Sequence, residues 1–129
     1  MTVRQLRLVV TAEDYEQVVR FYRGVLGMGE LAVWSSPDGG RVILLDAGRA
    51  TIELFDEGQA ESVDRIEAGR RVSGPVRLAW EVEDIDSATQ RLVAAGAEAE
   101  APPVVPPWGG RNARLRTPDG MQLTLFSEE

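Results

Sequence analysis

Thr51-Ile52-Glu53-Leu54-Phe55 is matched later in the chain by Gln122-Leu123-Thr124-Leu125-Phe126, and polar and apolar residues alternate in both stretches. Such alternation is typical of a strand with one buried face. A Pro-Asp-Gly turn also occurs in each half, at residues 37–39 and 118–120. The repeat takes up about half of the 129 residues, which is too long for one unit of a solenoid. The sequence therefore predicts two pseudo-symmetric modules that share a sheet.

The first module is predicted to have the order βαβββ. Strands are predicted over residues 3–10, 31–34, 41–46 and 50–55. Thr11-Ala12-Glu13-Asp14 is typical of a helix N-terminus, with Thr11 as the capping hydroxyl. Gly27 supplies a left-handed stop. Between them, apolar and aromatic residues recur at helical spacing: Tyr15, Val18, Val19, Tyr22, Val25 and Leu26.

The second module repeats this order over residues 75–129. Strands are predicted over residues 76–82, 98–104, 111–116 and 121–126, and a helix capped by Asp84 ends at Gly96. Residues 57–74 are mostly polar and are interpreted as a linker, within which a short helix over 62–68, capped by Ser62, is one option. We therefore expect a single domain made of a first module (1–56), a linker (57–74) and a second module.

Composition narrows the possible functions. The chain carries a net charge of −7, which argues against nucleic-acid binding, and it has no apolar run of the roughly 20 residues that a membrane span requires. It contains no cysteine and no histidine, so disulfides, thiolate ligands and imidazole chemistry are absent. No leader-like pattern opens the sequence. We expect a cytoplasmic protein whose chemistry uses carboxylates, hydroxyls, arginine or backbone groups.

Three short motifs resemble those of one known superfamily. They are Arg20-Phe21-Tyr22-Arg23-Gly24-Val25-Leu26-Gly27, Ala79-Trp80-Glu81-Val82-Glu83-Asp84 and Thr117-Pro118-Asp119-Gly120. In order and spacing they resemble the glyoxalase/bleomycin-resistance/dioxygenase (vicinal oxygen chelate) superfamily. The resemblance implies an α+β fold in which two βαβββ modules form a curled mixed sheet around a cleft, often within a homodimer.

The same resemblance implies four metal-ligand positions, which fall on Gln5, Glu53, Arg77 and Thr124, with Arg7 as an alternative to Gln5. Arg77 is a permanent cation and Thr124 a weak neutral donor, so this set is poorly suited to a divalent ion. A dioxygenase-type iron site would also need histidine, which the chain lacks. We therefore expect no metal or other cofactor, although a divalent metal held by Gln5, Glu53 and water stays a disfavoured alternative.

Several side chains are candidates for ligand binding. Glu53 and Arg77 are expected to pair across the two modules, either as a structural salt bridge or as a base and an oxygen-binding group. Trp34 and Trp108 lie beside turns and are candidates for stacking on a planar or cationic ligand. Asn112 and Arg114 share one strand face and are candidates for hydrogen bonds to it. The aromatic residues Phe21, Tyr22 and Trp80 are interpreted as core.

Two hypotheses of function follow. The first is sequestration of a small aromatic or cationic molecule, as in bleomycin resistance proteins, between Trp34, Trp108 and a floor of Glu53 and Arg77. The second is an enzyme, a lyase or isomerase of the glyoxalase type, in which Glu53 removes a proton beside a carbonyl group polarised by Arg77. An arginine beside the carboxylate lowers its basicity and weighs against the second hypothesis.

Overall fold

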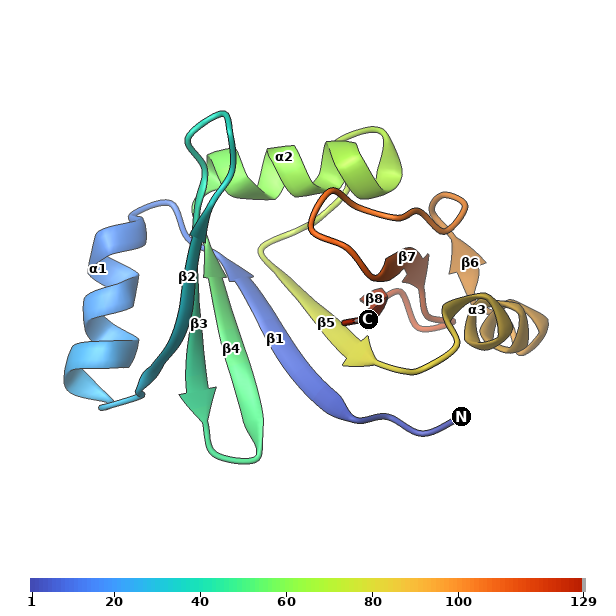
Figure 1. Cartoon of the computed structure of the whole chain (residues 1–129), viewed down its shortest axis with the longest axis horizontal. Coiled ribbons are helices and arrows are strands. Elements are labelled where there is room, and N and C mark those ends of the chain that lie inside the picture. The colour runs from blue at the N-terminus through green and yellow to red at the C-terminus, as the bar shows by residue number, and fades with distance from the viewer. Residues whose placement is uncertain (129) are drawn as a thin grey trace.

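Within residues 1–128, eight strands form a single curled, mixed sheet, and three α-helices lie along it (Figure 1). The structure is a computed structural model that describes residues 1–128. The first half contains β1 (Gln5–Thr11), α1 (Tyr15–Val19), the π-helical turn η1 (Arg20–Val25), β2 (Glu30–Ser35), β3 (Arg41–Ala47) and β4 (Ala50–Phe55). After α2 (Glu57–Ala68), the second half contains β5 (Val76–Glu81), α3 (Ile85–Ala94), β6 (Glu98–Ala99), β7 (Arg111–Arg116) and β8 (Gln122–Ser127).

The strand order β2-β3-β4-β1-β5-β8-β7-β6 contains the predicted duplication. In each half the first strand pairs in parallel with the last one, β1 with β4 and β5 with β8. The two halves meet where β1 and β5 pair antiparallel, with Arg7 opposite Ala79 and Val9 opposite Arg77. The expected α+β fold of two βαβββ modules in one curled sheet is confirmed.

The first helix begins later than predicted. Its cap is Asp14, whose carboxylate accepts a hydrogen bond from the backbone amide of Gln17 at 3.1 Å. The predicted cap, Thr11, is instead the last residue of β1 and pairs with Phe55. Strand pairing thus holds the backbone of Thr11 extended, and the chain turns into the helix only after it. Phe21 is also half exposed rather than part of the core.

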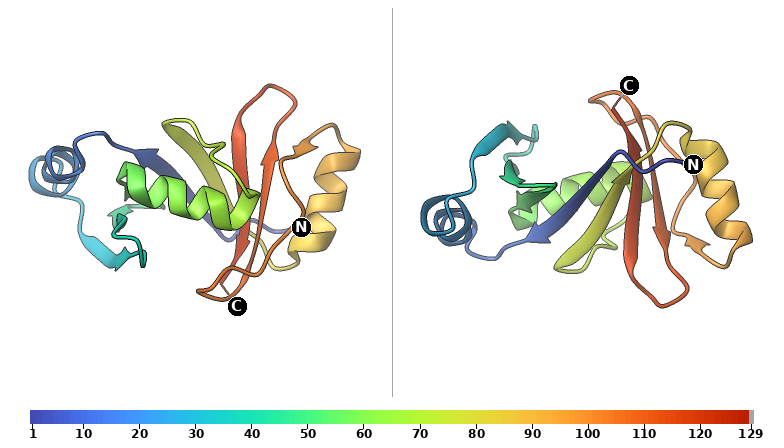
Figure 2. Two further views of the ribbon diagram at one scale, coloured as in Figure 1. Left: turned by 90° about the horizontal axis from the view of Figure 1, so that it is seen from above. Right: turned by 90° about the horizontal axis from the view of Figure 1, so that it is seen from below.

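The segment predicted as a polar linker contains a helix of 12 residues, α2. Its cap is Asp56, which accepts from the amide of Gln59 at 2.8 Å, whereas the suggested cap Ser62 lies buried in the middle of the helix. Gly69 ends it with a φ of 79°. The views in Figures 1 and 2 show α2 lying across the sheet where the two modules meet. The segment predicted as a linker is therefore mostly a helix that covers the sheet at the junction of the two modules.

The strand predicted over residues 98–104 is much shorter in the structure. Only Glu98 and Ala99 pair with β7, and Val104 adds an isolated bridge to Asn112. Pro102 and Pro103 lie between these contacts and have no amide hydrogen to donate to a ladder. The chain leaves the sheet there and returns as the loop that carries Trp108.

Apolar side chains gather in three clusters. One packs under α1 and includes Leu45 and Leu54, and a second packs under α3 and includes Leu115 and Leu125, with Trp80 against it as expected. The third lies between α2 and the sheet and contains Val9, Val42, Phe55, Ala60, Val63, Ala79 and Phe126. This third cluster surrounds a cavity. None of the helices within residues 1–128 has the length and apolar content needed to span a membrane.

Candidate ligand-binding site

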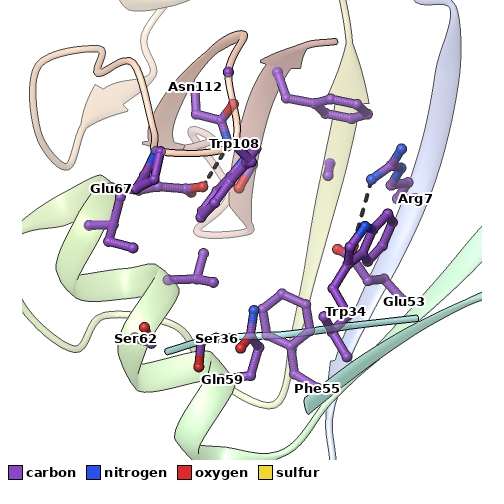
Figure 3. A pocket seen from close by; sticks show the side chains of 18 of the residues that line it. Arg7, Trp34, Ser36, Glu53, Phe55, Gln59, Ser62, Glu67, Trp108 and Asn112 are labelled. Atoms are coloured by element: carbon purple, nitrogen blue, oxygen red, sulfur yellow. Dashed lines mark hydrogen bonds and ion pairs between the residues drawn. The ribbon is translucent and has the colours of Figure 1, made fainter. Parts of the chain in front are cut away.

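A cavity of about 610 Å³ lies between α2 and the strands that face it. Its size is in the range of pockets that bind small molecules. Strands from both modules supply its floor, α2 supplies one wall, and the turn after β2 and the loop before β7 reach its rim. Figure 3 shows side chains from all of these elements pointing into one space. The site thus depends on both modules and on the helix between them.

The first module contributes Arg7 on β1 and Glu53 on β4. Arg7 Nη1 lies 3.6 Å from Glu53 Oε2, and both side chains are largely buried, each 13% exposed. Arg7 also donates from Nε to Gln5 Oε1 at 2.8 Å. Gln5 in turn donates to Glu81 at 3.0 Å and does not line the cavity. Of the two residues expected at the β1 ligand position, Arg7 is therefore the one at the cavity.

The second module contributes Arg77 on β5 and Thr124 on β8. Arg77 Nη1 donates to Thr124 Oγ1 at 2.7 Å, and the guanidinium carbon lies 5.6 Å from the centre of the Phe55 ring. Arg77 is 5% exposed and makes no ion pair within 4.0 Å among the described residues. Burial, followed by the nearby Arg114 cation, lowers the pKa of Arg77 to about 10. It remains a buried cation at neutral pH, and it borders the cavity.

These two pairs are related by the pseudo-symmetry of the fold. In each module an arginine on the first strand faces an acceptor on the last strand. The predicted ion pair between Glu53 and Arg77 is not formed, because Val9 lies between them in the register of β4, β1 and β5. Two strand spacings separate their backbones by roughly 9–10 Å. Because Glu53 and Arg77 both border the cavity, a small molecule bound there can reach both side chains.

The surroundings of the Glu53 carboxyl shift its pKa. Burial raises the pKa of Glu53 above its ordinary value, while the positive charges of Arg7 and Arg77 act in the opposite direction. A buried carboxylate with a raised pKa is a stronger base than one in water. The geometry therefore allows Glu53 either to balance the charge of Arg7 or to accept a proton.

Glu67 on α2 and Asn112 on β7 form the wall opposite this pair (Figure 3). Asn112 Nδ2 donates to Glu67 Oε2 at 2.6 Å, and Arg114 Nε donates to Glu67 Oε1 at 2.6 Å. Arg114 also contacts Asp64 at 2.8 Å and does not line the cavity. It was predicted as a ligand-binding residue, but it fastens α2 to β7 from behind the cavity wall. Asn112 does border the cavity, as expected.

Trp34 and Trp108 lie at the rim and both border the cavity. Trp34 comes from the edge strand β2 of the first module, and Trp108 from the loop before β7 of the second. Their exposed fractions are 46% and 56%, so each ring still has a free surface for contact. Aromatic rings placed in this way stack on planar groups. The structure brings together all of the predicted site residues except Gln5 and Arg114.

The site is poorly suited to the divalent metal that the resemblance implies. Within residues 1–128 no three carboxylate, histidine or cysteine side chains come close enough to share an ion. The β1 and β5 positions both carry guanidinium groups, which repel a cation, and Glu53 is the only carboxylate at the four positions. The donor set fits an oxygen-bearing ligand better than a metal.

Sequence reasoning missed the contribution of α2. Gln59, Ser62 and Glu67 border the cavity, together with Glu128, which follows β8. The signal was present in the apolar residues Ala60 and Val63 and in Ile66, at the spacing of one helix face. This helical pattern is hard to recognise because Glu67 and Asp64 are buried. Buried carboxylates are rare, so a sequence pattern containing them indicates a solvent-exposed segment.

Comparison with known proteins places the chain in a family. No curated protein matches the sequence significantly. The fold is similar to that of a hypothetical protein from Bacillus halodurans C-125, with a TM-score of 0.74, 19% identity and coverage of 100% of this chain and 96% of that one. It is also similar to methylmalonyl-CoA epimerase from Mycobacterium tuberculosis, with a TM-score of 0.69, 21% identity and coverage of 98% and 89%. A model of the Glyoxalase/Bleomycin resistance protein/Dioxygenase superfamily matches residues 4–125, and the chain belongs to this superfamily.

Proposed function

We propose that the protein binds, without a metal, a planar and mostly apolar small molecule that carries a carboxylate or carbonyl oxygen. The observation that supports this most directly is Arg77, a buried guanidinium that borders the cavity and has only Thr124 as a hydrogen-bond partner among the described residues. A buried cation without a paired carboxylate is costly unless a ligand completes its environment. An oxygen acceptor placed at Arg77 would do so.

The balance of charge around the cavity favours an acidic ligand over a cationic one. The carboxylate of Glu67 is engaged by Arg114 and Asn112, and that of Glu128 by Arg7. Glu53 is flanked by Arg7 at 3.6 Å and is influenced by Arg77. Among the described residues that border the cavity, Arg77 is thus the buried charge that no carboxylate pairs with. This revises the aromatic or cationic ligand expected from the sequence to an aromatic one with a negative or carbonyl oxygen.

Titration with three ligands that share one ring tests the proposal: benzoate, benzamide and benzylamine. Isothermal calorimetry is expected to show binding of benzoate, weaker binding of benzamide and none of benzylamine. Arg77→Gln should weaken benzoate binding by roughly tenfold or more, because a charge-assisted hydrogen bond is lost. Arg111→Gln is the matched control, since Arg111 lies on β7, outside the cavity, and pairs with the exposed Asp86. Preference for benzylamine, or equal effects of both substitutions, would contradict the proposal.

A second candidate is proton transfer, favoured by the raised pKa of Glu53. Glu53 would remove a proton from the carbon next to a carbonyl whose oxygen is held by Arg77, which leaves an enolate and a protonated Glu53. The Glu53 carboxyl would exchange its proton with solvent, and a solvent-derived proton would be returned to that carbon. Several proteins of this fold are epimerases by name, although at 18–21% identity they share only the fold. Exchange of such a proton in deuterated water, followed by NMR and abolished in Glu53→Gln, would support an enzyme. Binding without exchange would leave sequestration as the function.

A further inference from the structure

Arg7 is held in place before any ligand arrives. Its Nε donates to Gln5 Oε1 at 2.8 Å, and Gln5 is itself fixed by its hydrogen bond to Glu81 at 3.0 Å and by that of the Thr51 hydroxyl at 3.3 Å. The guanidinium carbon lies 4.6 Å from the centre of the Phe126 ring, which supports one face. The group therefore keeps a fixed orientation at the border of the cavity.

The carboxylate that Arg7 binds most closely is an exposed one. Glu128 Oε2 lies 2.9 Å from Arg7 Nη2, and the Glu128 side chain is 55% exposed. Glu53, at 3.6 Å, is beyond the distance of a normal hydrogen bond. Ion pairs with a solvated partner contribute little to stability, so Glu128 can leave at small cost. Its carboxylate occupies the place where an acidic group of a ligand would bind.

Arg7 and Arg77 lie on the same face of the sheet and on neighbouring strands. Because Arg7 is opposite Ala79 and Val9 is opposite Arg77, the two arginines are diagonal neighbours, roughly 7–8 Å apart at the backbone. We propose that the ligand is a planar diacid whose first carboxylate binds Arg77 and whose second binds Arg7, displacing Glu128. This inference rests on the proposed function, because it assumes that an acidic group binds Arg77.

Calorimetry with benzoate and the three benzenedicarboxylate isomers tests the inference on the full chain. One isomer, selected by the spacing of its carboxylates, is expected to bind about tenfold tighter than benzoate, as an added charge-assisted hydrogen bond would give. Glu128→Gln should raise the affinity for that isomer about threefold to fivefold, since the competing carboxylate is gone. The affinity for benzoate should stay unchanged. Arg7→Gln should remove the advantage of the diacid.

Asp38→Asn is the matched control for Glu128→Gln. Asp38 also borders the cavity, but its carboxylate accepts a hydrogen bond from the Ser36 hydroxyl and forms no ion pair with an arginine within 4.0 Å among the described residues. It should leave the ratio of diacid to benzoate affinity unchanged. If both substitutions raise the affinity for all anions equally, the cause is the change in overall charge and the inference is wrong. If benzoate binds through Arg77 but no diacid binds more tightly than benzoate, the inference of a diacid ligand is wrong and the proposed function stands. If neither benzoate nor any diacid binds, both fail.

Discussion

Replacing Arg77 by methionine should make the protein more stable. Burial lowers the pKa of Arg77 from its ordinary value to about 10, which means that its charged form costs roughly 3 kcal/mol in the folded state. Methionine fills a similar volume without that charge. The substitution leaves the Thr124 hydroxyl without its donor, which costs about 1–2 kcal/mol. We therefore expect the free energy of unfolding of Arg77→Met to rise by about 1–2 kcal/mol.

Urea denaturation at pH 7, followed by circular dichroism, measures this change directly. A thermal scan should show a Tm higher by roughly 4–8 °C for a domain of this size. The double variant Arg77→Met/Thr124→Val serves as a further check, because it removes the orphaned hydroxyl as well and should gain about 1 kcal/mol more. Benzoate binding should be lost in both variants.

The pH dependence of this stability difference tests whether the buried charge of Arg77 is its cause. Burial lowers the pKa of Arg77 to about 10, so the folded protein gives up this proton at a lower pH than the unfolded chain does. The cost of the charge is therefore present below pH 10 and is relieved as the pH rises above it. The advantage of Arg77→Met should shrink above pH 10. If Arg77→Met is instead less stable than the parent by 1 kcal/mol or more at pH 7, Arg77 is a structural residue and the argument for a ligand at this position fails.

Three further predictions concern stability and assembly. Asp64→Ala should lower the free energy of unfolding by roughly 3–5 kcal/mol in urea denaturation, because it breaks a buried ion pair with Arg114 and leaves the backbone amides of Val72 and Ser73 without their acceptor; a loss below 1 kcal/mol would contradict this. Gly110→Ala should destabilise the protein and alter the Trp108 loop, since Gly110 has a φ of 69° and a Cβ would collide with the carbonyl oxygen of Ser127; an unchanged Tm would argue against it. The homodimer implied by the family stays a prediction, and light scattering should show twice the mass of the chain. Val33 lies on the exposed edge strand β2, so Val33→Glu should reduce the measured mass if this apolar edge is the dimer contact.

The fold could be predicted because the two halves of the sequence contain the same local patterns of strands, turns and helix caps. The strands around Glu53 and Thr124 have the same alternation, and each is the last strand of its module, so the pattern of one half supports the assignment of the other. Asp84 is predictable as a cap from its position before the helical pattern, and its carboxylate accepts a hydrogen bond from the backbone amide of Ser87 at 3.1 Å at the start of α3. Thr11 was misassigned because the pairing of β1 with Phe55 on β4, a contact distant in sequence, decides where the helix can begin.

The site was harder to predict because its geometry depends on register. Alternation places Glu53 and Arg77 on the inner face, and both do border the cavity. Only the pairing of β4, β1 and β5 shows that Val9 separates them and that Arg7 is the closer partner of Glu53. Polarity also misled the interpretation of residues 57–74, since Glu67 is charged and yet 3% exposed.

Stability and ligand binding are connected through α2. Hydrogen bonds from Ser73 and the nearby Arg114 lower the pKa of Asp64, although burial alone would raise it, so that this carboxylate stays charged and holds Arg114. Arg114 holds Glu67, and Glu67 holds Asn112 at the cavity wall. The negative charges of Glu67 and Asp64 also act on Arg77. The network that fastens α2 to the second module is therefore the same one that tunes the buried cation on the floor. A ligand that satisfies Arg77 should bind only the folded protein and raise its Tm with concentration, as mass action requires.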